Sequence, residues 1–346
     1  MADAQSPAPA SSRATTTKIV GGLLFAVAVL TGLSLFGDIG DIGRAFRAFN
    51  WWLIVPILLL TIWNYAWRFV KWQLFVKRLD IGPISTSTSL LVFLSGFSMS
   101  ITPGKVGELI KSVYLRRLTG APVNRTSAII AAERVTDGMA MVILAAIGLI
   151  EFTYGRTLVA VLAIGIAAGL ILLQRPVWVR RFILKLEDRR FVGRGVPHGL
   201  AFLDASESLY KPQTLVRAVG LGVLSWIAEC IAFYLVLIGL GIDGNWKLFL
   251  IATFVLAVSS LLGGISMLPG GLGVADASVA GMLLVLVDDE KMTRTTAAAA
   301  TLIIRFSTLW FAVLIGALAV SILERTIRAG TVPSPALEEP RPIASQ

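Results

Sequence analysis

The sequence contains very little of the chemistry on which many enzymes and metalloproteins depend. Its 346 residues include one cysteine, Cys230, and one histidine, His198. An intrachain disulfide is therefore excluded, and a zinc site built from several His and Cys ligands cannot be assembled. A Ser-His-Asp triad would have to use His198, which lies in a basic segment with glycine and proline and is predicted to be a surface residue. The sequence predicts no metal, no cofactor and no catalytic residue.

Charged residues are also scarce. They make up 15% of the chain, against roughly 25% in soluble domains, while 56% of the residues are hydrophobic. Several apolar stretches approach the ~20 residues that cross a bilayer, which predicts an all-α polytopic membrane protein. The net charge of +10 falls mostly in loops. Because cytoplasmic loops of membrane proteins are enriched in Lys and Arg, this charge does not predict nucleic acid as a partner.

The two ends of the chain differ in composition from its middle. Residues 1–17 are rich in Ala, Ser, Pro and Thr, and residues 330–346 are rich in Pro, so both are predicted to be disordered tails. The N-terminal stretch is too long and too polar for the n-region of a cleaved signal peptide, so the first span is expected to be retained. A transmembrane domain is predicted over 18–329. Its six full spans are expected at about 19–36, 51–74, 127–150, 154–175, 213–240 and 295–323.

A short motif occurs twice in apolar surroundings. Residues 100–107 and 266–273 both read S-x-x-P-G-x-x-G, and their prolines lie 166 positions apart, from 103 to 269. Pro and Gly interrupt helices, and an interrupted helix at membrane depth is tolerated only beside protein or a water-filled cavity. We therefore expect re-entrant hairpins at 85–115 and 248–287. Paired interruptions in two halves of a chain point to the binding site of a transporter.

The distribution of basic residues predicts the orientation. Segment 175–217 holds nine Lys and Arg residues and is expected to be cytoplasmic, which places both termini in the cytoplasm. The first hairpin then enters from the cytoplasm and the second from the opposite side. Each half has three full spans, an odd number, so an inverted-topology repeat is expected, with repeat 1 at 18–150 and repeat 2 at 151–325. Segment 176–212 would be a basic amphipathic insertion. The alternative is that the motif recurs by coincidence in a glycine-rich chain.

Several ionisable residues fall inside the predicted spans, where charge is costly and usually functional. Glu133, Arg134 and Asp137 open the third span. They either offset the helix dipole or face a central cavity. Glu229 and Arg305 lie inside two other spans and suggest an ion pair, either structural or substrate-handling. Arg68 and Lys71 lie near the end of the second span. Their charged groups are predicted to snorkel to the membrane interface.

A polar stripe follows the first Pro-Gly break. Its members recur every three residues and drift slowly around one helical side. The exposed backbone N–H groups that precede it, at 102–104, are suited to an anion. The stripe is therefore either a solvated face or a headgroup-binding surface. Its members are Lys105, Glu108, Lys111, Tyr114 and Arg117.

The same residues carry a resemblance to a known family. The run from Ser95 to Arg117, with 132–135 and Asp137, resembles the first signature of the lysylphosphatidylglycerol synthase transmembrane region, the flippase-like domain of the MprF type. Residues 269–274 resemble its second signature, and the resemblance covers about 20–325. It implies a bacterial or archaeal membrane protein that moves lipids between leaflets. Asp276 stands where many members are expected to have Glu.

In bifunctional members this region flips aminoacylated phosphatidylglycerol made by a separate synthase domain. Only a short tail follows the last predicted span here, so the lysyl lipid is not carried over as the expected substrate. The expected function is that of a lipid flippase without enzyme activity, multi-pass in the bacterial inner (cytoplasmic) membrane. The alternatives are a membrane-embedded lipid-modifying transferase and a non-transporting scaffold of a lipid-modification pathway. The chain has no G-x-x-x-x-G-K-[ST] motif, so ATP is not expected to be the direct driver.

The expected partners are lipids: an anionic or aminoacylated phospholipid, or a hopanoid or polyprenyl-type lipid. The sequence also allows a lipid-synthesis enzyme and a second copy of the chain as partners. Basic residues of the site would attract phosphate, and acidic ones would hold them, bind a cationic headgroup or carry protons (Glu133 or Glu229). The predicted substrate-binding residues are Thr102, Pro103, Gly104, Lys105, Gly107, Glu108, Lys111, Arg117, Glu133, Arg134, Asp137, Glu229, Pro269, Gly270, Gly271, Gly273 and Arg305.

Overall fold

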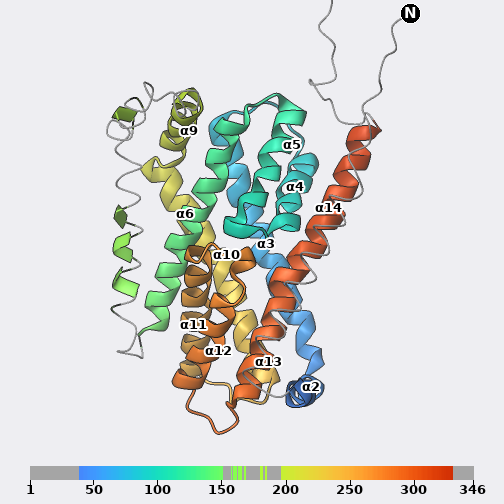
Figure 1. Cartoon of the computed structure of the whole chain (residues 1–346), viewed down its shortest axis with the longest axis vertical. Helices are drawn as coiled ribbons and strands as arrows, with labels where there is room; N and C mark the ends of the chain where they lie inside the picture. The colour runs from blue at the N-terminus through green and yellow to red at the C-terminus, as the bar shows by residue number, and fades with distance from the viewer. Residues whose placement is uncertain are drawn as a thin grey trace, which may run out of the picture.

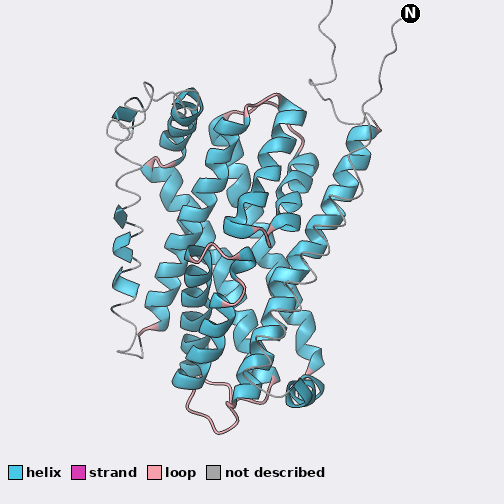
Figure 2. Cartoon of the chain, in the orientation of Figure 1, coloured by secondary structure: helices cyan, strands magenta, loops and turns pink. Residues whose placement is uncertain are grey.

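A computed structural model describes residues 39–150 and 196–329, with scattered residues between 157 and 184. Every regular element in these ranges is helical (Figure 2). The all-α fold expected for a polytopic membrane protein is confirmed. The predicted span 19–36, most of the predicted span 154–175, much of the predicted insertion 176–212 and both tails lie outside the described residues.

The first part of the bundle consists of two long helices with a broken hairpin between them (Figure 1). The long helices, α3 and α6, each contain 26 residues. The hairpin is made of short α and 3-10 segments, because its apolar sequence is interrupted by glycine and proline. The elements are α2 (Ile39–Ala48), η1 (Trp51–Leu53), α3 (Ile54–Leu79), α4 (Thr86–Ser95), η2 (Gly96–Met99), η3 (Pro103–Leu109), α5 (Ile110–Thr119) and α6 (Val123–Gly148).

The second part also contains long helices and a hairpin, and the arms of this hairpin are longer. Side-chain caps fix two of its helix starts: the Asn245 side chain accepts the Leu248 N–H, and Thr293 accepts the Thr296 N–H. The last helix contains one π-helical turn, η6. The elements are α9 (Val196–Leu209), α10 (Pro212–Gly239), α11 (Trp246–Ile265), η5 (Pro269–Gly271), α12 (Val274–Leu286), α13 (Arg294–Arg305), η6 (Phe306–Trp310) and α14 (Phe311–Arg328).

Among the described residues, five helical stretches are long and apolar enough to cross a membrane: Trp51–Leu79, Pro212–Gly239, Trp246–Ile265, Pro269–Leu286 and Arg294–Arg328. They include the predicted spans 51–74, 213–240 and 295–323, and both arms of the second hairpin. The predicted span 127–150 corresponds to α6, which carries three interior charges. Its start was placed too late, because hydropathy does not detect the polar first turn that follows Pro122.

The two hairpins lie at opposite ends of the molecule. Figure 1 shows α4 and α5 in the upper half and α11 and α12 in the lower half. Their tips meet between the two halves, where the Gly104 N–H donates a hydrogen bond of 3.0 Å to the Met267 carbonyl. The expectation that the hairpins enter the membrane from opposite sides stays a prediction.

A reciprocal contact joins α3 to α10. The Asn64 Nδ2 donates to the Ser225 carbonyl at 3.1 Å, and the Ser225 hydroxyl donates to the Asn64 carbonyl at 3.3 Å. Both side chains are completely buried. An exchange of equivalent bonds is what a two-fold axis between the halves would produce. The inverted repeat itself stays a prediction.

Buried apolar residues of the described ranges gather in two main clusters, one around each hairpin. Along α6, Ile129 belongs to the upper cluster and Met141 to the lower one, and the charged residues of this helix lie between them. Along α10, Trp226 and Glu229 follow Val219 of the upper cluster. The fold therefore places a polar layer between two apolar cores.

Gly316 allows α14 to pack directly on η2, and its replacement by alanine is expected to separate them. A Cβ at this position would lie 2.2 Å from the Ser98 backbone nitrogen. Such overpacking costs about 1–3 kcal/mol, because backbone cannot move aside as a side chain can. The thermal unfolding midpoint in detergent should fall for Gly316→Ala and should not fall for Gly281→Ala, where a Cβ meets nothing within 4 Å. Equal midpoints for the two variants would contradict this packing.

Candidate functional site

The repeated motif builds the two hairpin tips in different ways. In the first tip, the Thr102 hydroxyl accepts the Gly107 N–H at 2.8 Å, and a Cβ at Gly107 would lie 2.6 Å from that hydroxyl. Only glycine fits at the last position of the first motif, because a side chain there would clash with the threonine of the same motif. Gly104 has a φ of +58°, a conformation that glycine adopts without strain.

In the second tip, all three predicted glycines, Gly270, Gly271 and Gly273, have positive φ. The Gly273 N–H donates to the Asp276 carboxylate at 2.8 Å, which closes the first turn of α12.

Asp137 is the centre of the polar layer. One of its carboxylate oxygens lies 2.5 Å from the Lys71 Nζ and accepts the Trp226 indole N–H at 3.0 Å. The other lies 3.2 Å from Arg134 and 3.9 Å from Arg68. Three cations from α3 and α6 thus surround one carboxylate, which leaves this side of the layer positive.

The expectation that Arg68 and Lys71 snorkel to the interface is wrong. Only 1% of the Lys71 side chain and 11% of the Arg68 side chain are exposed. Both face the bundle interior. Gly222 of α10 faces the ammonium group, and a Cβ at this position would be in ordinary contact with it, at 3.7 Å. The Arg68 guanidinium stacks between the rings of Phe97 and Trp226, at 5.2 and 5.7 Å from their centroids.

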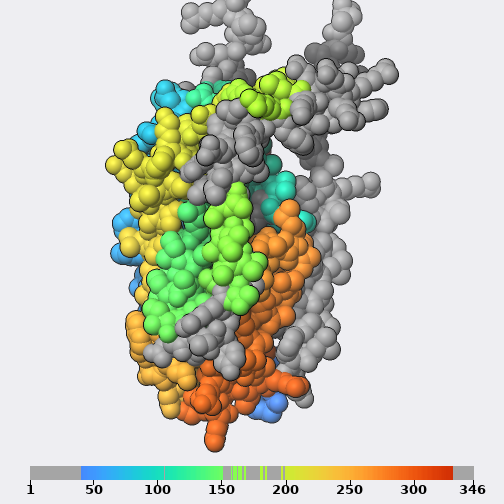
Figure 3. Space-filling model, turned by 90° about the vertical axis from the view of Figure 1, so that its left-hand side faces the viewer, coloured from blue at the N-terminus to red at the C-terminus, as the bar shows by residue number. Residues whose placement is uncertain are grey.

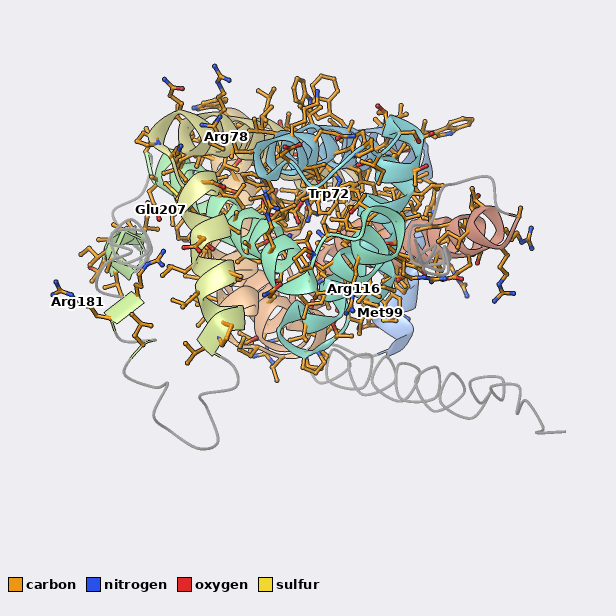
Figure 4. The ribbon with its side chains drawn as sticks, turned by 90° about the horizontal axis from the view of Figure 1, so that it is seen from above. Trp72, Arg78, Met99, Arg116, Arg181 and Glu207 are labelled. Atoms are coloured by element: carbon orange, nitrogen blue, oxygen red, sulfur yellow. The ribbon has the colours of Figure 1, made fainter. Side chains whose placement is uncertain are left out.

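Lys111 is the centre of a second group of charges, next to the first. Its Nζ lies 2.5 Å from Glu133 and 3.6 Å from Glu108, and Glu108 lies 3.6 Å from Arg134. The Lys111 stem crosses Gly96 of the first hairpin, where a Cβ would lie 2.8 Å from it. Its ammonium group lies 5.0 Å from the ring centroid of Trp72. Viewed from above, Trp72 lies among the helices in the middle of the bundle, and Arg181 lies at its edge (Figure 4).

The structure supports the hypothesis that Glu133, Arg134 and Asp137 face the interior of the bundle, and not the hypothesis that they offset the helix dipole. Helix α6 begins at Val123, so these residues lie about three turns inside it and do not open it. The helix-dipole explanation therefore does not apply, because the dipole acts within the first turn.

The polar stripe of the first hairpin does not form a single surface. Residues 103–109 are 3-10 helical and α5 begins only at Ile110, so the stripe crosses a change of helix type. Glu108 and Lys111 turn inward. Tyr114 and Arg117 instead contact Glu324 of α14, at 3.0 and 2.7 Å. The backbone of Lys105 is part of the first tip, and its side chain lies outside the described atoms.

Arg305 pairs with Asp276, at 2.6 Å. The partner comes from the next helix of the same half, α12, which packs against α13. Arg305 and Glu229 are nevertheless brought together, because both line one internal cavity.

Two hollows adjoin the polar layer. The inner cavity has a volume of about 140 Å³ and lies between the halves. The groove is larger, about 550 Å³, within the size range of ligand sites. Trp226 stands in the walls of both. The inner cavity is lined chiefly by Tyr65, Arg68, Glu108, Glu229, Ser259 and Arg305, and the groove chiefly by Gly104, Arg134, Asp137, Met141, Leu261 and Met267.

The groove is amphipathic. Arg134 and Asp137 form its polar wall, and side chains of α6, α11 and the second tip form its apolar wall. Those residues between 157 and 168 that the structure describes lie between the green α6 and the orange second hairpin in Figure 3. Two of them, Val161 and Gly165, also line the groove.

Sequence reasoning did not identify Arg68, Lys71, Trp226 and Ser259 as site residues. It noted Asp276 only because many members of the family are expected to have Glu at this position. One signal was available: Trp226 precedes Glu229 by three residues and shares its helix face. No local signal marks Lys71, because a basic residue near a span end is usually interfacial. Within the described ranges, no group of three or more His, Cys, Asp or Glu residues could hold a metal ion.

The described residues thus form a helical membrane protein with two opposed, broken hairpins around a layer of buried ion pairs. Residues 19–316 match the family of the lysylphosphatidylglycerol synthase TM region, and the chain belongs to this family. The predicted family resemblance is thus confirmed.

The chain is also similar to "UPF0104 membrane protein" sequences of Methanothermobacter thermautotrophicus. One is 24% identical over 324 residues, which cover 86% of this chain and 93% of the relative. Another is 23% identical over 314 residues, which cover 85% and 91%.

Proposed function

We propose that the protein is a lipid flippase, without enzyme activity, that passes a phosphate-bearing headgroup through the groove between the hairpin tips. The observation that carries this proposal is the composition of the groove. Its charged wall lies at the meeting point of the tips, and its apolar wall continues along α6 and α11. A lipid has the same division into a polar and an apolar part.

Arg134 is the residue best suited to hold the phosphate. Its side chain is 28% exposed and lines the groove. Its Nε has no hydrogen-bond partner in the structure, whereas one Nη lies 3.2 Å from Asp137 and 3.6 Å from Glu108. A guanidinium presents such donors in the planar fork that matches phosphate. Lys71 and Arg68 behind it add to the positive potential of this wall.

The acyl chains would stay on the lipid side of the groove. Apolar side chains such as Ile143, Ile147 and Val161 are exposed on this part of the molecule, as expected for contact with lipid. The headgroup alone then has to cross the protein interior, which removes the largest cost of unassisted flipping, the exposure of a charge to hydrocarbon.

The distribution of charge supports a cytoplasmic location for the end that carries α5. Basic residues gather at this end of the described helices, and the positive-inside rule places such residues in the cytoplasm. The membrane would be the bacterial inner membrane. The basic residues are Lys77, Arg78, Arg116, Arg117 and Arg125.

Arg134→Gln is expected to slow lipid transport at least about tenfold, because a hydrogen bond to a charged group contributes about 1.5–3 kcal/mol. The measurement is the movement of headgroup-labelled anionic phospholipid in proteoliposomes. Arg117→Gln is the matched control, since Arg117 lies outside the groove and pairs with Glu324.

Equal rates for Arg134→Gln and the wild type would rule out this headgroup site. A wild-type protein that is folded and moves no lipid of any headgroup would instead favour the scaffold alternative.

A further inference from the structure

The inner cavity contains two buried donor groups that make no hydrogen bond within the protein. One is the hydroxyl of Ser259 on α11, a residue that is only 2% exposed. The other is the Nε of Arg68 on α3, whose side chain is 11% exposed. Buried polar groups of native proteins are hydrogen-bonded to protein, to water or to a ligand. Two such donors at one cavity indicate that it receives a polar group.

The formal charges that line this cavity balance. Two guanidinium groups, of Arg68 and Arg305, and two carboxyl groups, of Glu108 and Glu229, stand in its wall. A ligand with a net charge would upset this balance inside the protein, where an uncompensated charge is costly. The cavity is therefore suited to an uncharged polar group.

Hydroxyl groups match this lining. A hydroxyl donates one hydrogen bond and accepts up to two, so a molecule with several hydroxyls can accept from Arg68 and Ser259 and donate to carboxylates. The rings of Tyr65 and Trp226 form apolar parts of the wall and suit the carbon skeleton of such a molecule. The volume of about 140 Å³ corresponds to about four or five molecules of liquid water, which is the size of a small polyol.

The cavity adjoins the lipid groove close to the proposed phosphate site. Glu108, which lines the inner cavity, lies 3.6 Å from an Nη of Arg134, which lines the groove. Trp226 and three glycines stand in the walls of both hollows, and a glycine places no side chain between them. A group attached to a phosphate at Arg134 would therefore lie next to the inner cavity. The three glycines are Gly263, Gly264 and Gly271.

We propose that the inner cavity is a subsite for an uncharged, hydroxyl-bearing part of the headgroup, so that the transported lipid carries a polyol on its phosphate. The proposal rests on the proposed lipid transport and names the substrate class for it. Arg134 holds the phosphate in the groove, while Arg68 and Ser259 donate to hydroxyl oxygens in the cavity. A site built to bind a hydroxyl rejects an analogue that lacks it, because the buried donors of the site are then left unpaired.

The test compares two phospholipids that differ only in these hydroxyls. Phosphatidylglycerol and phosphatidylpropanol carry the same phosphate charge and the same three headgroup carbons, and a fluorescent label on an acyl chain leaves both headgroups unaltered. In proteoliposomes, the wild-type protein should move phosphatidylglycerol about tenfold faster, because a neutral hydrogen bond that is lost changes a rate by up to about tenfold. Phosphatidylethanolamine, which carries an amine in place of the hydroxyls, is the third lipid.

Ser259→Ala should reduce this preference severalfold by slowing phosphatidylglycerol and leaving the rate of phosphatidylpropanol unchanged. Its unfolding midpoint without ligand should not fall, because the hydroxyl that is removed makes no hydrogen bond within the protein. Ser321→Ala is the matched control. Ser321 is an exposed residue of α14 that lines neither hollow, so this variant should keep the wild-type preference.

Binding of the water-soluble headgroup provides a readout that needs no transport. Glycerophosphoglycerol should raise the unfolding midpoint of the detergent-purified wild type more than its propyl analogue does, and Ser259→Ala should remove this difference. Equal rates for the two lipids and equal midpoints for the two ligands would show that the cavity holds water only, which overturns the subsite and leaves the flippase proposal intact. Faster movement of phosphatidylethanolamine than of phosphatidylglycerol would overturn it in favour of an amine. A midpoint difference with no movement of any lipid would support the subsite and overturn the flippase.

Discussion

Replacing Gly264 by phenylalanine is expected to abolish lipid transport and leave the fold unchanged. Gly264 lines both the groove and the inner cavity. A Cβ at this position meets nothing within 4 Å, and the glycine is helical with no positive φ. An aromatic side chain of this size would therefore extend into the hollow and fill much of it. Helix stability should not fall, because phenylalanine is a better helix former than glycine.

Gly220→Phe is the matched control for this experiment. Gly220 is also a helical glycine with open space around it, but it is exposed on α10 and lines neither hollow. Both variants should purify with the wild-type unfolding midpoint, and only Gly264→Phe should lose transport of headgroup-labelled lipid. Full activity in Gly264→Phe would show that lipid does not pass through this groove.

Asp137→Asn is expected to produce the largest loss of stability of any single substitution in the polar layer. The change leaves Lys71, Arg68 and Arg134 without their shared carboxylate, and Lys71 is completely buried. Removing one partner of a buried ion pair costs about 3–5 kcal/mol. The yield of folded protein and the thermal unfolding midpoint in detergent should both fall sharply.

Two variants make this stability result specific. Asp204→Asn, which removes a carboxylate from an exposed pair with Arg180, should change little, because surface pairs contribute about 0–1 kcal/mol. The double variant Lys71→Met with Asp137→Asn should recover part of the lost stability, since the most deeply buried unpaired charge is then gone. A wild-type midpoint for Asp137→Asn alone would contradict the central place of this carboxylate.

The sequence predicted the plan of the described helices well, because that plan depends on long-range hydropathy and on two helix breaks. The Pro103 and Pro269 motifs marked both tips, and the apolar runs around them marked the arms. Boundaries were less accurate where polar turns belong to helices, as at the start of α6. The predicted first and fourth spans lie outside the described residues.

The candidate site was predicted in part. Glu133, Arg134 and Asp137 were identified, because charged residues stand out inside an apolar span. Their partners were not, since ion pairing depends on how helices from different parts of the chain are rotated against each other. Arg305 is an example. The sequence suggested Glu229 as its partner, and nothing in the sequence indicated that α12 and α13 would bring Asp276 to it.

The two hairpins also differ in which partner of an ion pair their second arm carries. In the first half, the hairpin arm α5 carries the cation of the closest pair, Lys111, and the following helix carries the carboxylate, Glu133. In the second half the arm α12 carries the carboxylate, Asp276, and the following helix carries the cation, Arg305. Two halves with opposite polarity would not bind the same ligand alike.

The most direct measurement of the central claim uses the wild-type protein in unilamellar vesicles with a headgroup-labelled anionic phospholipid in both leaflets. A membrane-impermeant reductant is added outside, and the label that it destroys is followed. A flippase with this groove predicts that label is lost from both leaflets, whereas protein-free vesicles lose only the outer half. If vesicles that hold folded wild-type protein also lose only the outer half, with and without a pH gradient, the protein does not move this lipid.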